Sequence, residues 1–199
     1  MKNSNKFLDI LYKYRISKYL VYQLLKARAK ALEKTVLPYL NKGELILDIG
    51  PASCTVTEIL LEQDLKVFPL DIENFSIVDT VSPTIYDGHR MPFKDDQFET
   101  SLILFVLHHT YDPTELLIEA KRVSKKIIVF EDIVTSSTHK FLTAALDSLL
   151  NLEFYDQPHT TKRDEEWRTL FRHLGLKLLD QEYRTSAVII RHAMYFLEK

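Results

Sequence analysis

The stretch Leu45-Ile46-Leu47-Asp48-Ile49-Gly50-Pro51-Ala52-Ser53-Cys54 carries the strongest structural signal in the chain. Its first five residues form an apolar run with one carboxylate near the end, which is typical of a buried parallel strand. Residues 57–62 have helical composition, so the pattern predicts a strand, a tight turn and a helix. Gly50 lets the backbone turn sharply and approach a ligand. In open α/β sheets, ligands bind at such junctions.

A second apolar run, residues 66–70, ends at Asp71, which lies 21 residues after Gly50. An acidic residue at about this spacing holds a ribose diol in nucleotide-binding folds. A dehydrogenase fingerprint would also need glycines where this chain has Ala52 and Thr55. The pattern therefore favours a nucleoside-containing ligand, with a nicotinamide oxidoreductase as a less favoured alternative.

Composition indicates one globular domain over residues 1–199, with 46% hydrophobic and 27% charged residues. The single cysteine, Cys54, excludes an internal disulfide and a CxxC metal site, and no His/Cys cluster has metal-ligand spacing. Charged residues interrupt every apolar run before it reaches the length of a membrane span. We therefore expect a cytoplasmic protein without a metal.

The amino-terminal segment, residues 1–43, has a net charge of +8, whereas residues 44–199 have a net charge of −10. Apolar positions at helical spacing predict a basic helical cap on the body, and we expect it to act as a lid over a substrate pocket. A solvated helix face is the commoner interpretation of such a segment. Tyrosines interleaved with its basic residues are also compatible with a helix that lies on a membrane surface or with a nucleic-acid-binding patch. We expect no nucleic-acid partner.

The middle of the chain continues the alternation of strands and helices. A short strand over 84–86 ends in Asp87-Gly88, and the apolar run 102–107 is followed by His108-His109. Asp112 and Pro113 predict the start of a helix that runs to Val123, with Lys125-Lys126 closing its end. Residues 127–130 predict a further buried strand.

The last third of the chain predicts two helices and a hairpin. Residues 141–150 form an apolar helical segment, and 163–174 form an amphipathic helix ended by Gly175. We expect Trp167 of this helix to lie in the core. Two strands, over 176–183 and 187–197, joined by a short connection at 184–186, indicate an antiparallel pair.

Five pieces in order across residues 44–134 resemble a class I S-adenosylmethionine-dependent methyltransferase. The resemblance is to the small-molecule group that includes the ubiquinone/menaquinone C-methyltransferases. It implies a Rossmann-like, seven-stranded, mostly parallel sheet with helices on both faces and an antiparallel carboxyl-terminal hairpin. The pieces are Leu47-Asp48-Ile49-Gly50, Asp71, Asp87-Gly88 with Met91-Pro92-Phe93 and Asp95-Asp96-x-Phe98, 106–109 with Asp112-Pro113, and Glu119 with Arg122-Val123.

The resemblance implies S-adenosylmethionine as the cofactor and S-adenosylhomocysteine as its product. By position in the motifs, Asp48 would serve the methionine end, Asp71 the ribose hydroxyls, and Ile72 the adenine. The loop at Asp87 would lie by the adenine amino group. The candidate cofactor-binding residues are Asp48, Gly50, Ala52, Asp71, Ile72, Asp87, Gly88, His89 and Phe105.

Methyl transfer depends mainly on holding the acceptor in line with the methyl group, but an oxygen or nitrogen nucleophile must also lose a proton. His108 and His109, at the end of a predicted strand, are the candidate catalytic residues, with a structural role in the following turn as the alternative. Apolar and aromatic residues in the predicted lid segments favour a small hydrophobic or aromatic acceptor.

The chain departs from the family pattern in the glycine loop and after the fourth strand. Ala52 and Cys54 stand where relatives usually have glycine, and Phe105 stands where they often have a polar residue. These departures keep a second interpretation open, namely a non-catalytic S-adenosylmethionine-binding or regulatory module.

Overall fold

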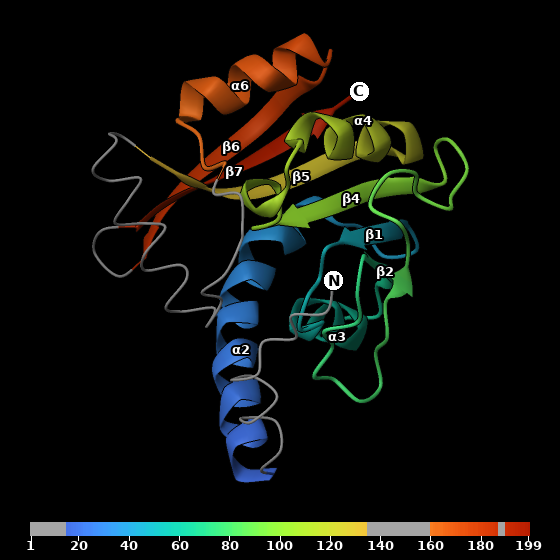
Figure 1. The fold of residues 1–199 in the computed structure, drawn as a ribbon, viewed down its shortest axis with the longest axis vertical. Helices are drawn as coiled ribbons and strands as arrows, with labels where there is room; N and C mark the ends of the chain where they lie inside the picture. The colour runs from blue at the N-terminus through green and yellow to red at the C-terminus, as the bar shows by residue number, and fades with distance from the viewer. Residues whose placement is uncertain (1–14, 135–159, 187–189) are drawn as a thin grey trace.

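In the computed structural model, which describes residues 15–134, 160–186 and 190–199, seven strands form one sheet in the order β3-β2-β1-β4-β5-β7-β6 (Figure 1). Neighbouring strands from β3 to β5 pair in parallel, and β7 pairs antiparallel with both β5 and β6. The expected Rossmann-like sheet with its antiparallel hairpin is confirmed. The strands are β1 (Leu45–Ile49), β2 (Lys66–Asp71), β3 (Thr84–Ile85), β4 (Phe98–Leu104), β5 (Ser124–Ile133), β6 (Lys177–Ser186) and β7 (Ile190–Glu198).

Helices cover both faces of the sheet. On one face, Val36 of α2 and Leu60 of α3 pack on Ile46 and Leu102. The other face carries α4 and α6, as Figure 1 shows. The helices are α2 (Arg15–Val36), α3 (Thr55–Glu62), α4 (Pro113–Val123) and α6 (Asp164–His173), with 3-10 turns η1 (Leu37–Tyr39) and η2 (Leu107–His109).

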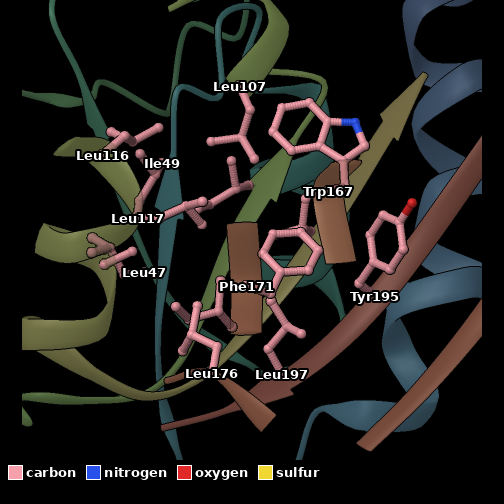
Figure 2. Packing of buried hydrophobic residues seen from close by; sticks show 14 of the residues in the cluster. Leu47, Ile49, Leu107, Leu116, Leu117, Trp167, Phe171, Leu176, Tyr195 and Leu197 are labelled. Atoms are coloured by element: carbon pink, nitrogen blue, oxygen red, sulfur yellow. The ribbon is translucent and has the colours of Figure 1, made fainter. Parts of the chain in front are cut away.

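The larger core lies under α4 and α6. Figure 2 shows Trp167 and Phe171 of α6 beside Tyr195 of β7 and leucines of α4. Trp167 is fully buried, as the spacing of α6 predicts, and its ring stacks at 6.3 Å on Phe171. The Tyr195 hydroxyl donates to Asp164 Oδ1 at 2.7 Å, so the polar end of this aromatic side chain is satisfied.

Two predicted boundaries in the middle of the chain are wrong. The strand expected over 102–107 starts earlier, at Phe98, and ends at Leu104, because Phe105 has a φ of 61° that no strand accommodates. Lys125 and Lys126 lie in β5 and do not close α4, since both pair with Glu99 on the adjacent strand β4. The two lysines therefore stabilise the β4–β5 pair through cross-strand charge pairing, and not the end of α4 through its helix dipole.

Of the other predicted boundaries, one agrees with the structure, one is wrong and one lies outside the described residues. Asp112 caps α4 by accepting a hydrogen bond from the Thr114 amide at 2.8 Å, with Pro113 at the first helical position. The connection expected at 184–186 instead belongs to β6. The helix expected over 141–150 falls outside the described residues.

Candidate active site

The sheet reverses its strand order between β1 and β4, and the carboxyl ends of these strands meet at one edge. Ligands bind at such a switch point in open α/β sheets. The structure brings to this edge the loop after Gly50, Asp71 at the end of β2, and the turn at Phe105 after β4. These three segments therefore come together although they are far apart in sequence.

The carboxylate of Asp71 is held by two backbone amides. Its Oδ2 accepts from the Ala52 N–H at 3.1 Å, and its Oδ1 accepts from the Ile72 N–H at 2.7 Å. Burial raises the pKa of Asp71, although these amides oppose the shift. A carboxylate has about four lone-pair directions, so acceptor capacity remains for a ligand hydroxyl. Asp71 also ties the end of β2 to the loop after β1.

The loop after β1 keeps left-handed backbone at all three positions of the glycine pattern. The φ values are 68° at Gly50, 45° at Ala52 and 57° at Cys54. Non-glycine residues rarely adopt this conformation, so the loop follows a glycine-loop course despite its side chains. A Cβ at Gly50 would lie 2.8 Å from Val106 Cγ2, so the close approach that requires glycine here is to the turn after β4.

Asp48 faces the interior. It is buried, and its Oδ2 accepts from the Thr57 hydroxyl of α3 at 2.6 Å. Burial raises the pKa of Asp48 to about 6, the Thr57 hydrogen bond lowers it, and the nearby charge of Asp71 raises it further. This carboxylate therefore joins β1 to α3 as well as lying under the predicted site.

The adenine side of the predicted site is open to solvent. Ile72 is 61% exposed, and a Cβ on Gly88, which has a φ of 84°, would lie 3.4 Å from Ile72 Cγ2. Asp87 Oδ1 accepts from the backbone amides of His89 and Arg90, which lowers the pKa of Asp87. The His89 ring lies 3.1 Å from Glu115 and its pKa is raised by that carboxylate. The exposed apolar side chain of Ile72 thus lies beside the turn at Asp87 and Gly88.

Phe105 lies in an aromatic cluster on the α2 side of the sheet. Its amide donates to the Phe130 carbonyl at 2.7 Å, and its ring meets Phe130 and His192 edge-on at 4.9 and 5.3 Å. The Arg28 guanidinium of α2 lies 4.8 Å from the centre of the Phe105 ring. Phe105 therefore connects the turn after β4 with α2 and β7.

The two predicted histidines differ in their surroundings. His108 is 2% exposed and its Nδ1 lies 2.5 Å from Glu131 Oε2, while Glu131 Oε1 accepts from the Leu107 amide at 2.6 Å. His109 is partly exposed, and its ring centre lies 4.0 Å from that of His108. The carboxylate of Glu131 therefore fixes the turn that carries both rings.

Sequence reasoning missed Glu131 and Asp132 at the end of β5, and it also missed His192, which pairs with Asp132. Glu131 and Asp132 are consecutive, so their side chains point to opposite faces of the sheet. Asp132 Oδ1 lies 2.6 Å from His192 Nδ1, across the β5–β7 pair. The available signal was the same as for Asp48 and Asp71, namely a carboxylate at the end of an otherwise apolar strand.

These residues fit an S-adenosyl nucleoside. Asp71 supplies buried acceptor oxygens, Ile72 and Gly88 supply an open apolar surface, and the loop at Gly50 follows the required backbone course. Within the described residues no group of three or more His, Cys, Asp or Glu side chains has the geometry of a metal site. No helix of the described residues is long and apolar enough to cross a bilayer.

Comparison with known families and structures agrees with this geometry. Residues 47–127 match the model of a methyltransferase domain. No curated protein matches the chain. The matched residues include Asp48, Asp71, Asp87 and the adjacent histidines His108 and His109.

Solved structures share the fold at low sequence identity. A SAM-dependent methyltransferase from Archaeoglobus fulgidus is similar with a TM-score of 0.62 and 18% identity, over 89% of this chain and 94% of that one. Magnesium protoporphyrin IX methyltransferase from Synechocystis PCC 6803, solved with bound SAH, has a TM-score of 0.62 and 12% identity, over 94% and 88%. The cyclase SpnF has a TM-score of 0.64 and 11% identity, over 89% and 81%.

The comparisons and the geometry of the site point to the same class of protein. At such identities the solved structures show a common fold, and the domain match adds the methyltransferase signature of the segment that builds the site. Residues 47–127 thus resemble a methyltransferase domain, and the chain shares its fold with SAM-dependent methyltransferases.

Proposed function

We propose that the chain transfers a methyl group from S-adenosylmethionine to a small hydrophobic or aromatic acceptor. The observation that carries this proposal is the carboxylate of Asp71, held by the Ala52 and Ile72 amides at the switch point of the sheet. Ile72 and Gly88 would line the adenine, and Asp87 would receive its amino group. Asp48 would act at the methionine end, through the loop that begins at Gly50.

When bound, S-adenosylmethionine supplies an electrophilic methyl group on a good leaving group. The chain then needs to hold the acceptor in line and to take a proton if the nucleophile is oxygen or nitrogen. His109 is the more suitable proton acceptor of the two predicted histidines, because His108 is enclosed with Glu131. In this proposal His108 and Glu131 position His109 at the end of β4.

Calorimetric titration with S-adenosylhomocysteine, with NAD as the comparison ligand, tests the cofactor. We expect micromolar binding of S-adenosylhomocysteine and none of NAD. Asp71→Asn keeps the shape of the side chain but loses its charge, so affinity should fall at least tenfold, about 1.4 kcal/mol. Asp79→Asn, at an exposed carboxylate paired only with Lys18 in the described residues, is the matched control. Equal affinity in both variants would contradict the role of Asp71.

Transfer of radiolabelled methyl to a panel of phenols, quinols and aromatic carboxylates tests the reaction and the acceptor class. His109→Gln should lower turnover of a hydroxyl acceptor by 10²-fold or more with little change in S-adenosylhomocysteine binding. His173→Gln, at an exposed histidine of α6, is the control. If His109→Gln leaves turnover unchanged, then His109 is structural.

A second candidate function is a binding module without methyl transfer. Ala52 and Cys54 replace glycines in the cofactor loop, and the cyclase SpnF has the same fold. This function predicts S-adenosylhomocysteine binding without methylation of any panel member. The two candidates are thus separated by product formation and not by affinity.

A further inference from the structure

Helix α2 has two apolar faces. One face packs on the body through buried residues such as Ala29 and Val36. The opposite face carries an apolar row at helical spacing, which we call the outer stripe: Leu20, Leu24, Ala27 and Ala31. Leu20 and Leu24 are 63% and 72% exposed, and Tyr19 beside them is 60% exposed. A surface helix normally has a polar outer face, so this stripe marks an interaction surface.

The cations of α2 fall into two sets. Lys18 pairs with Asp79, and Lys26 pairs with Glu58 and Glu62 of α3, so these lysines fix the helix to the body. Lys30 and Lys34 are exposed, flank the outer stripe, and have no ion pair among the described residues. Basic residues therefore adjoin the exposed leucines along the same side of the helix.

We propose that the outer stripe of α2 binds an anionic lipid surface, with its leucines in the interfacial layer and Lys30 and Lys34 at lipid phosphates. A row of leucines bordered by lysines is the pattern of an interfacial amphipathic helix. The amino-terminal end of α2 points away from the sheet, so the stripe can reach a planar surface (Figure 1).

Charge complementarity selects this occupant. Helix α2 has six Lys or Arg residues and a single carboxylate, Glu33, whereas residues 44–199 have a net charge of −10. An anionic surface would attract the helix and repel the body, which orients the molecule with α2 against the lipid. Nucleic acid is a poorer occupant because phosphate contacts leave exposed leucines unused. The proposal is independent of the proposed methyl transfer.

Co-sedimentation of the full chain with lipid vesicles tests this surface. We expect binding to vesicles of phosphatidylglycerol and phosphatidylcholine, weaker at higher salt, and none to phosphatidylcholine alone. The double variant Leu20→Glu, Leu24→Glu should lower the partition coefficient at least tenfold. The double variant Lys30→Gln, Lys34→Gln should lower it severalfold. Both change exposed side chains, and circular dichroism checks that the fold is retained.

Matched controls use the other side of the molecule. Ile118→Glu changes an exposed apolar residue of α4, and Lys66→Gln changes an exposed lysine of β2, so neither should alter vesicle binding. Absence of vesicle binding, or equal losses in stripe and control variants, would overturn the proposal. A dimer in size-exclusion chromatography that Leu24→Glu dissociates, without vesicle binding, would assign the stripe to a second copy of the chain and would also overturn it.

Discussion

Buried carboxylates have different partners at the β1–β2 half and at the β5 half of the carboxyl edge of the sheet. Under the predicted cofactor half, Asp48 and Asp71 accept hydrogen bonds from neutral groups, a hydroxyl and two backbone amides, and burial raises the pKa of both. At the end of β5, Glu131 and Asp132 each lie within 2.6 Å of a histidine nitrogen. The carboxylates of the β1–β2 half can therefore accept hydrogen bonds from a ligand, whereas those at the end of β5 already have histidine partners within the chain.

This difference indicates that one pair of carboxylates is suited to ligand binding and the other pair stabilises the fold. Carboxylates without a cationic partner gain most when a ligand brings hydroxyl or ammonium donors, which supports our proposal that the nucleoside binds at the β1–β2 half. Carboxylates paired with histidine hold the turn after β4 and the β5–β7 pair in one geometry. The two pairs are themselves unequal, because the His108 pair is fully enclosed whereas the His192 side chain is 12% exposed.

The largest expected effect is at Glu131. Glu131→Ala removes the acceptor of the Leu107 amide and the partner of His108, so the free energy of unfolding should fall by about 3–5 kcal/mol. Urea denaturation measures the change. Glu131→Gln, which keeps an acceptor oxygen but loses the charge, should cost less and provides a folded variant if Glu131→Ala is too unstable.

Asp132→Ala is the comparison for Glu131→Ala. Its pair with His192 lies nearer the surface, so the loss should be about 1–2 kcal/mol. Equal losses at the two positions would show that enclosure does not distinguish the pairs.

The next effect is a pH dependence at Asp48. Burial raises the pKa of Asp48 from 3.8 to about 6, so folding favours its protonated form. Its stabilising contribution is present below about pH 4 and is lost as the pH rises to about 6, a change of about 3 kcal/mol. Unfolding curves from pH 4 to 7 for the wild type and for Asp48→Asn isolate this group. If the difference in free energy of unfolding between the two proteins stays constant across that range, the pKa of Asp48 is not raised by burial.

Sequence reasoning predicted the elements that local chemistry dictates. The apolar run ending in Asp48, the carboxylate at Asp71 and the Asp112-Pro113 helix start each depend on neighbours within a few residues. The antiparallel hairpin also followed from alternation and a short connection, although its boundary at 184–186 was wrong. Among the candidate cofactor residues, Gly50 and Asp71 followed from the strand ends and their spacing, whereas the others were implied by the family resemblance.

The parts that the sequence did not predict depend on contacts between distant strands. Glu131 meets His108, and Asp132 meets His192, only after β4, β5 and β7 have paired. Likewise, the placement of Lys125 and Lys126 in β5 depends on Glu99 across the sheet. Spacing along the chain contains no signal for such partners.

A smaller effect concerns strain in the cofactor loop. Ala52 is exposed with a φ of 45°, so Ala52→Gly should raise the free energy of unfolding by about 1 kcal/mol by relieving left-handed strain. Cys54 has similar backbone, but its side chain is buried against Val78 and Val81, so Cys54→Gly should not stabilise the protein. Thermal unfolding of both variants tests this. Stabilisation by both substitutions would mean that relief of backbone strain outweighs the loss of side-chain packing at Cys54.

The smallest effect is at the contact between Arg28 of α2 and Phe105, in the turn after β4. The Arg28 guanidinium lies over the Phe105 ring, and because Arg28 is exposed this contact should contribute only about 0.5–1 kcal/mol. Arg28 and Phe105 each have other neighbours, so a double-mutant cycle with Arg28→Gln and Phe105→Leu is needed to isolate the pair. A coupling energy near zero would mean that the other contacts of α2, namely its buried apolar face and the ion pairs of Lys18 and Lys26, hold the helix. A clear coupling would show that Arg28 helps to hold α2 against the aromatic cluster of Phe105, Phe130 and His192.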